Sequence, residues 1–350
     1  MTVSTTSRNA ADFYKEVGAE AFPHIMCDGK AYKLSPAFKL RGYSNETHPR
    51  IPPKIENYVF ELSPFFDTVA WLMQPDKTAL WLSGPTGCGK TSLIEQVCSR
   101  LNWPVASITC SSRTEFRDFV GGFQLTTPKG ETQPRMKFVH GVLPLAMRMG
   151  WVLLINEVDM VDPGELVGLN DILEGKPLQI LENQGEVITP HPCFRLVVTA
   201  NSNGAGDASG VYSGVRTQNV AAMDRYRMIE CKYPSPKAEE QMLTLSGTPD
   251  ELAHRMVQFA NDVRQAVFTA SLSVPLSTRV LMHWAKSSRM YSEIFQSASK
   301  SASDEFRQPL KKALQIHWLS KLSPDEQRAA NEIAFGVFGD LWMPTKSRRR

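Results

Sequence analysis

Residues 84–91 read GPTGCGKT, and this stretch decides the fold that we predict for the chain. It matches the pattern GxxxxGKT, and it stands between the apolar run ALWL (79–82) and the helix-like run SLIEQVCSRL (92–101). Glycines in such a loop let backbone N–H groups turn inward around phosphates, and the start of the following helix adds a dipole that favours anions. The stretch therefore predicts a phosphate-binding loop made by Gly84, Pro85, Thr86, Gly87, Cys88, Gly89, Lys90 and Thr91.

Two side chains of this loop and two at the end of a later apolar run are the predicted phosphate-binding, metal-binding and catalytic residues. In a loop of this type Lys90 reaches the terminal phosphates of ATP, and the hydroxyl of Thr91 ligates Mg²⁺. The apolar run WVLLIN (151–156) is expected to end in a metal-orienting carboxylate, followed by a base that polarises the attacking water. Glu157 stands in place for the base, but Asn156 occupies the metal-orienting position. A neutral amide can hydrogen-bond a Mg²⁺-bound water but adds no charge, so we predict weaker Mg²⁺ retention with the base intact.

Apolar runs around this loop indicate an α/β fold. Helical or loop segments separate five of them, as in a parallel sheet covered on both faces, and we assign residues 51–233 to this domain. Beyond YPSPKAEEQ (233–241) the apolar period becomes helical, with a helix expected after Ser277, and we assign residues 234–343 to a small all-helical domain. Residues 1–50 read as a loop-like extension and residues 344–350 as a basic tail. The five runs are TALWLSG, VASIT, WVLLIN, FRLVVTAN and RMIECKY.

Composition narrows the classes of function. The 350 residues include no apolar run of about 18 residues, and the N-terminus lacks a secretory signal pattern, so we expect no membrane span and, by default, a cytoplasmic location. A net charge of +3 is too small to imply nucleic acid as a partner. The six cysteines form no CxxC pair, which argues against a zinc site or a disulfide framework.

Further polar residues follow the later strands, and two interpretations of each remain open. Asn201 ends the run VVTAN and could place its amide between a phosphate and the attacking water, or it could be an ordinary turn residue. Arg225, Arg227 and Arg279 could stabilise charge on a transferred phosphoryl group, or they could be solvated surface arginines.

Several motifs, in their order along the chain, resemble those of the AAA+ ATPases of the MoxR group. Longer stretches narrow the resemblance to the ATPase subunits of aerobic cobaltochelatases, the CobS type, and it covers roughly residues 40–340. The shared motifs are GPTGCGKT, LLINEVD (153–159), VVTAN (197–201), MDRY (223–226) and LSTR (276–279), and the longer stretches include KFVHGVLPLAMR (137–148) and NVAAMDRYRMI (219–229).

The resemblance implies a homo-oligomeric ATPase ring, usually of six subunits, with ATP and Mg²⁺ between an α/β domain and a helical lid. By the family pattern Asn201 senses the γ-phosphate, Arg225 is a finger that acts in trans, and Arg279 is the lid sensor, while Arg227 stays unassigned. Such rings work with a partner that carries a von Willebrand type A domain. Asn156 departs from the family, whose members mostly carry an acidic residue there, and this departure suggests a relative with another client.

Two insertions typical of this branch span residues 121–141 and 177–191, and the second alternates as a β-hairpin would. Both are expected to face a partner or the pore of the ring, unless they only lengthen surface loops.

The sequence leaves three classes of function. They are a motor ATPase that remodels or loads a partner, with cobalt insertion into a corrin ring as its specific form; a nucleotide-gated scaffold with slow or absent hydrolysis; and, more weakly, a nucleic-acid translocase, for which a basic stripe with interleaved aromatics is missing.

Overall fold

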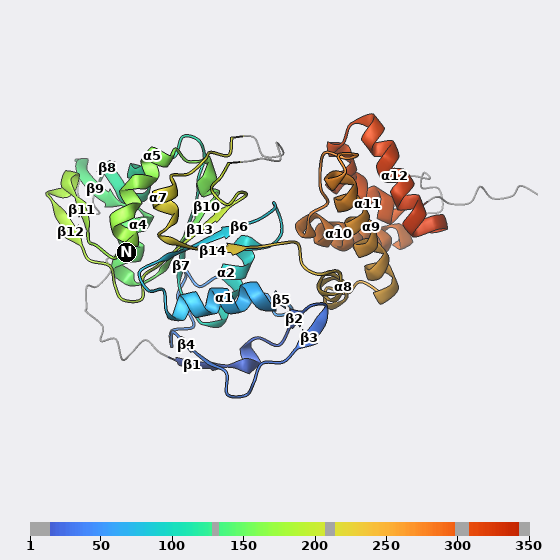
Figure 1. Cartoon of the computed structure of the whole chain (residues 1–350), viewed down its shortest axis with the longest axis horizontal. Helices are drawn as coiled ribbons and strands as arrows, with labels where there is room; N and C mark the ends of the chain where they lie inside the picture. Colours follow the sequence, from blue (N-terminus) through green and yellow to red (C-terminus); the bar gives the residue numbers. More distant parts are fainter. Residues whose placement is uncertain (1–14, 128–132, 207–213, 298–307, 343–350) are drawn as a thin grey trace, which may run out of the picture.

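The computed structural model of the chain describes residues 15–127, 133–206, 214–297 and 308–342 (Figure 1). Residues 1–14 of the predicted extension, the predicted basic tail and the middle of the first insertion lie outside these ranges. A part made of strands and helices carries the phosphate loop, and an all-helical part follows it in the chain. The domain boundaries drawn from the sequence, at residues 51, 234 and 344, stay predictions.

The core of the first part is a five-stranded parallel sheet with the strand order β14-β6-β13-β10-β7. Each strand comes from one of the five predicted apolar runs, so this prediction is confirmed. The central strands are largely apolar because both faces of the sheet are covered there, and every side chain of β6 and β13 is buried, whereas the edge strands β7 and β14 each keep exposed residues. The strands are β6 (Ala79–Ser83), β7 (Val105–Thr109), β10 (Val152–Asn156), β13 (Arg195–Ala200) and β14 (Tyr226–Glu230).

Successive side chains of each strand point to opposite faces, and each face packs on its own helices. Leu80 and Leu82 pack with α1 and α2, which lie below the sheet in Figure 1, whereas Trp81 packs with α4 on the other side. The phosphate loop joins β6 to α2 at the carboxyl edge of the sheet. The helices of this part are α1 (Leu62–Met73), α2 (Lys90–Arg100), α3 (Phe116–Val120), α4 (Val142–Met149), α5 (Pro163–Leu166), α6 (Asn170–Leu173) and α7 (Val220–Met223).

The N-terminal extension is not loop-like, which corrects the prediction for the residues that the structure describes. Its short strands form a two-stranded pair, β1-β4, beneath α1 in Figure 1, and β3 and β2 join β5, which follows the extension in the chain, in a three-stranded sheet at one end of α1. Hydrogen bonds of Tyr43 tether this extension to the core, because its backbone N–H donates to Leu101 O (2.8 Å) and its hydroxyl donates to Gly150 O (3.0 Å). The strands are β1 (Lys15–Gly18), β2 (Ile25–Cys27), β3 (Lys30–Tyr32), β4 (Lys39–Gly42) and β5 (Phe60–Glu61).

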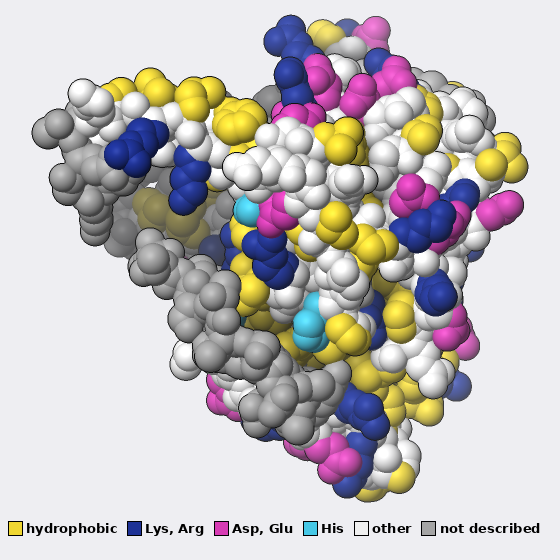
Figure 2. Space-filling model, turned by 90° about the vertical axis from the view of Figure 1, so that its left-hand side faces the viewer, with side chains coloured by type: hydrophobic (Ala, Val, Ile, Leu, Met, Phe, Trp, Pro, Cys, Tyr) yellow, Lys and Arg dark blue, Asp and Glu magenta, His cyan; other side chains and the backbone are white. Residues whose placement is uncertain are grey.

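Both predicted insertions contain antiparallel hairpins, and the prediction of a hairpin in the second is confirmed. The His140 ring shares a 2.6 Å hydrogen bond with Glu186, so the two hairpins touch. Figure 2 shows the face that carries them, where hydrophobic side chains lie among lysines and arginines; exposed apolar residues there include Phe123, Leu125, Met136, Leu181 and Val187. The strands are β8 (Gly121–Thr126), β9 (Arg135–His140), β11 (Leu178–Ile180) and β12 (Glu186–Ile188).

The helical part buries its own aromatic core. Phe259 lies at its centre and contacts Trp284, Trp318, Phe338 and Trp342 at ring-centroid distances of 5.5–6.4 Å. Among the described residues, no helix combines the length and apolar content that crossing a membrane requires. The helices are α8 (Pro236–Leu245), α9 (Asp250–Phe268), α10 (Thr278–Ser297), α11 (Pro309–His317) and α12 (Pro324–Phe338), and α10 begins directly after Ser277, as predicted.

Candidate functional site

The phosphate loop is shaped by glycines that no other residue could replace easily. Gly84, Gly87 and Gly89 have φ angles of +145°, +75° and +107°, in the region that side chains disfavour. A Cβ atom on Gly84 would also overlap the carbonyl oxygen of Cys231. The loop therefore folds tightly against the end of β14, and its backbone turns into α2 at Lys90.

Lys90 places its ammonium inside the loop. Its Nζ donates to Gly84 O at 2.6 Å, to Pro85 O at 3.2 Å and to the side-chain Oδ1 of Asn201 at 3.1 Å, and the residue is 8% exposed. All three acceptors are neutral oxygens. A phosphate oxygen carries a full charge and makes a stronger hydrogen bond, so it would compete well for this ammonium.

Thr91 and Asn156 meet beside Lys90. The Thr91 hydroxyl donates to Asn156 Oδ1 at 2.8 Å, and the Thr199 hydroxyl donates to the same oxygen at 3.1 Å. This set of hydroxyl and amide oxygens fits Mg²⁺, which prefers oxygen ligands and usually keeps several waters. Bound there, the ion would neutralise phosphate charge. Thr91 and Asn156 are the residues that would hold it, without the carboxylate charge that an aspartate would add.

Glu157 is held in an uncommon backbone conformation directly after β10. Its φ and ψ are 56° and 42°, in the left-handed region, and such values at non-glycine residues concentrate at functional sites. The amide of Asn201 donates to Glu157 Oε2 at 2.7 Å. One side chain, Asn201, therefore contacts both the candidate base and Lys90, while the sensor role that the family resemblance implies for it stays a prediction.

Asp159 is a residue that the sequence reasoning missed. It is fully buried, and its Oδ2 accepts the backbone N–H groups of Asn201 (2.8 Å) and Ser202 (3.1 Å). Its backbone oxygen accepts the N–H of Arg216 at 2.8 Å, so one residue anchors both ends of the segment that follows β13. An acidic residue two positions after Glu157 is the signal that could have pointed to it.

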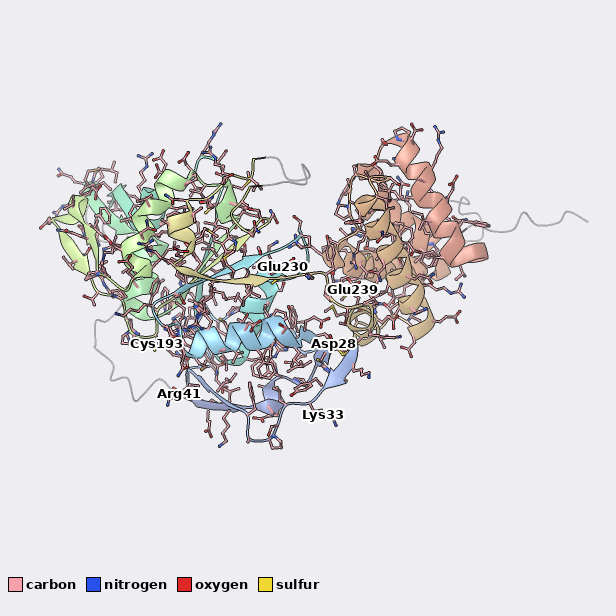
Figure 3. The ribbon with its side chains drawn as sticks, viewed as in Figure 1. Asp28, Lys33, Arg41, Cys193, Glu230 and Glu239 are labelled. Carbon is pink, nitrogen blue, oxygen red and sulfur yellow. The ribbon has the colours of Figure 1, made fainter. Side chains whose placement is uncertain are left out.

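A cavity of about 640 Å³ opens beside the phosphate loop at the carboxyl edge of the sheet. Figure 3 labels Glu230 there, at the end of β14. Burial raises the pKa of the Cys231 thiol to about 12 and also raises the pKa of Cys88, so neither cysteine is a thiolate nucleophile at neutral pH. The cavity is lined by Ser83, Gly84, Pro85, Asn201, Ser202, Asn203, Met228 and Glu230.

The helical part touches the phosphate loop at two points. The backbone N–H of Arg279, at the start of α10, donates to Gly87 O at 3.3 Å, while its side chain is exposed. The hydroxyl of Tyr233, in the linker, donates to Thr86 O at 3.2 Å, and the Arg264 guanidinium lies 4.2 Å from the Tyr233 ring centroid. The helical part therefore contacts the loop through the backbone of Arg279, while the sensor role predicted for the Arg279 side chain stays a prediction. Tyr233, which itself packs against Arg264, adds a contact that the sequence did not reveal.

Arg225 lies away from the loop of its own chain. It precedes the first residue of β14, Tyr226, which pairs with Ala79 at the start of β6, whereas the loop follows Ser83 at the other end of β6. At about 3.3 Å per residue, Arg225 is about 16 Å along the strand from Glu230. Arg227 instead pairs with Asp76 at 2.5 Å. The structure therefore brings Lys90, Thr91, Asn156, Glu157 and Asn201 together and leaves Arg225 and Arg227 outside that group.

Comparisons with known proteins identify the family to which the chain belongs. Residues 79–213 match the family described as AAA domain (dynein-related subfamily), and residues 239–301 match the CbbQ/NirQ/NorQ C-terminal family. The chain is 32% identical over 264 residues to the aerobic cobaltochelatase subunit CobS of Sinorhizobium sp, covering 71% of this chain and 79% of that protein. The chain belongs to the MoxR-type AAA+ ATPases and is CobS-like.

Two further proteins are similar to this AAA+ ATPase. The protein CbbQ of Hydrogenophilus thermoluteolus is 25% identical over 209 residues, covering 59% of this chain and 73% of that protein. Among solved structures, a mutant RuvB of Thermotoga maritima matches with a TM-score of 0.45 at 15% identity, covering 77% of this chain and 73% of that one. Membership of the family implies nucleotide and Mg²⁺ use, assembly into oligomers and work with partner proteins.

Proposed function

We propose that this AAA+ ATPase is a working motor that hydrolyses ATP to remodel or load a partner protein. The observation that supports hydrolysis most directly is the side chain of Asn201, which contacts Lys90 Nζ and Glu157 Oε2 at once. A residue in this position can register a terminal phosphate and hold the base at the same time. A nucleotide-binding relic would have little reason to keep this arrangement.

The chain's own residues suggest how the reaction proceeds. Lys90 and the inward-turned backbone of the loop bind and orient the phosphates, and Lys90 stabilises negative charge that develops on them. Glu157, held by Asn201, orients the attacking water and accepts its proton at a carboxylate oxygen. Mg²⁺ held near Thr91 and Asn156 would supply charge neutralisation. Because Asn156 is neutral, we infer that the enzyme is active but needs more Mg²⁺ than a relative with a carboxylate there.

The finer assignments also belong to this proposal. Arg225 lies at the opposite edge of the sheet from its own loop, so it can serve a nucleotide only on another copy, as in a ring of six subunits. The client would be a protein with a von Willebrand type A domain, contacted through the two hairpins. Cobalt insertion into a corrin ring is the specific form suggested by similarity to a cobaltochelatase subunit.

The alternative function is a nucleotide-gated scaffold that binds ATP and assembles with slow or absent turnover. The neutral side chain of Asn156 at the metal-orienting position favours this alternative. Phosphate release across a Mg²⁺ titration separates the two functions. For the motor, the wild-type rate exceeds that of Glu157→Gln at saturating Mg²⁺, and Glu157→Gln still binds ATP while Lys90→Ala does not. A wild-type rate no higher than that of Glu157→Gln at every Mg²⁺ concentration would reject the motor and favour the scaffold.

A further inference from the structure

Hydrogen bonds within its own subunit fix the side chain of Arg225. Its Nε and Nη2 both donate to Glu174 Oε1, at 3.0 and 2.6 Å, and its Nη1 donates to Ala221 O at 2.7 Å. The side chain is 29% exposed. A surface arginine normally samples many rotamers, so three hydrogen bonds to its guanidinium are a marked restriction.

These three hydrogen bonds leave two N–H donors of the guanidinium available to bind a ligand. Arginine has five N–H donors in a rigid fork, and the three hydrogen bonds use three of them. Because Glu174 takes the side that carries Nε, the remaining donors are on Nη1 and Nη2. Two donors in this fork suit two oxygens of one phosphoryl group.

We propose that Glu174 is the positioning residue for Arg225, and that it aims the free end of the guanidinium at the nucleotide of a neighbouring copy. This inference rests on the proposed trans role of Arg225 and adds the residue that orients its guanidinium. Glu174 does not touch the nucleotide. It acts by restricting the rotamers of Arg225, so that the guanidinium is already oriented when two copies meet.

The surroundings of Glu174 keep it charged for this task. Lys176 Nζ contacts its second oxygen, Oε2, at 2.8 Å, and Lys176 also pairs with Asp171 at 2.8 Å. The bonds from Lys176 and then from Arg225 hold the pKa of Glu174 below its ordinary value. The carboxylate can therefore hold Arg225 through one oxygen and Lys176 through the other across the neutral pH range.

Mixed assemblies of full-length variants test this inference. A Lys90→Ala chain cannot use nucleotide but carries the finger, and an Arg225→Ala chain has the opposite defect, so mixing the two restores hydrolysis at the shared interfaces. Adding Glu174→Ala to the Lys90→Ala chain is expected to cut the restored kcat at least tenfold, in line with roughly 100-fold losses from small misplacements. The KM for ATP should stay unchanged, because the binding loop belongs to the other chain.

The controls separate positioning from folding. The same Glu174→Ala change placed in the Arg225→Ala chain should leave the restored activity intact, because that copy has no finger to position. Asp171→Asn in the finger-bearing chain removes only the charge of the second partner of Lys176 and should also have little effect. Glu174→Gln keeps one acceptor oxygen and should give an intermediate kcat.

Three negative outcomes of this experiment have distinct meanings. If the parent mixture restores hydrolysis and Glu174→Ala in the finger-bearing chain lowers it less than about twofold, Glu174 does not position the finger. An equal loss when the change is placed in either chain would also overturn the inference, since it would indicate a structural role. If the parent mixture itself stays inactive while each chain still assembles, the trans role of Arg225 is wrong, and the inference about Glu174 is rejected with it.

Discussion

The buried ion pair between α8 and α9 gives the sharpest prediction about stability. Glu239, labelled in Figure 3, has a fully buried side chain, and Arg264 is 12% exposed. Arg264 donates to both carboxylate oxygens at 2.8 Å, and the Thr278 hydroxyl donates to Glu239 Oε1 at 2.6 Å. The change Glu239→Gln keeps the shape of the side chain but removes its charge and one acceptor.

The size of the effect follows from burial. The amide NH₂ of the glutamine must face a guanidinium N–H, so Arg264 loses a partner where little water can replace it. Breaking a buried pair by altering one member costs about 3–5 kcal/mol. An exposed pair on the same helix, Glu251 with Arg255 at 2.6 Å, provides a matched control, because Glu251 is 80% exposed. Such surface pairs contribute about 0.3–0.5 kcal/mol.

The assay compares Glu239→Gln with Glu251→Gln by urea-induced unfolding of the full chain and by hydrogen exchange of α8 and α9. We expect faster exchange in both helices for Glu239→Gln and wild-type exchange for Glu251→Gln. Since Arg264 lies against Tyr233, which donates to Thr86 in the phosphate loop, the half-saturating ATP concentration should also rise for Glu239→Gln. A loss of stability below about 1 kcal/mol for Glu239→Gln would refute the reasoning.

Three further changes test other parts of the structure. Asn156→Asp should lower the Mg²⁺ concentration for half-maximal phosphate release and keep or raise the rate; an unchanged Mg²⁺ dependence would contradict the role given to this residue. Gly84→Ala should cost about 1–3 kcal/mol in calorimetric unfolding and weaken binding of a fluorescent ATP analogue, since its Cβ would overlap Cys231 O; wild-type values for both would count against this packing. Side-chain hydrogen bonding with Ser273, followed by that with Ser323, is the largest of the effects that lower the pKa of Glu326 from 4.5 to about 2, so its stabilisation is complete above pH 4.5 and is lost as the pH falls towards 2. Glu326→Gln should therefore lower the melting temperature at pH 7 and converge with wild type near pH 2, and an equal difference at both pH values would show that the charge is not responsible.

The sequence was informative wherever local chemistry determines structure. The strands of the sheet were predictable because a strand buried on both faces is a nearly continuous apolar run, as in Val152 to Ile155 of β10. The phosphate loop was predictable because only glycine readily adopts the φ angles found at Gly84 and Gly89. The second hairpin was predictable because side chains alternate about a turn that contains Gly185.

Contacts between distant residues could not be predicted in this way. The strands of the N-terminal extension are three or four residues long and mostly polar on one side, so they have no clear period. Asp159 and Glu174 look like ordinary surface acids in the sequence, and their roles depend on backbone N–H groups and a guanidinium brought from elsewhere in the chain. The register of β14 against β6, which sets the place of Arg225, likewise exists only in the folded sheet.

The short strand β14 has a mechanical consequence. At its start, Ala79 N–H donates to Arg225 O at 3.0 Å; beyond its end, Cys231 N–H donates to Ser83 O at 2.7 Å, directly beside the phosphate loop. One strand thus joins Arg225, the residue proposed to serve a neighbouring copy, at its first end to the border of the subunit's own phosphate loop at its other end. In a ring of the proposed kind, a displacement of this strand would therefore act on the subunit's own loop and on Arg225 together.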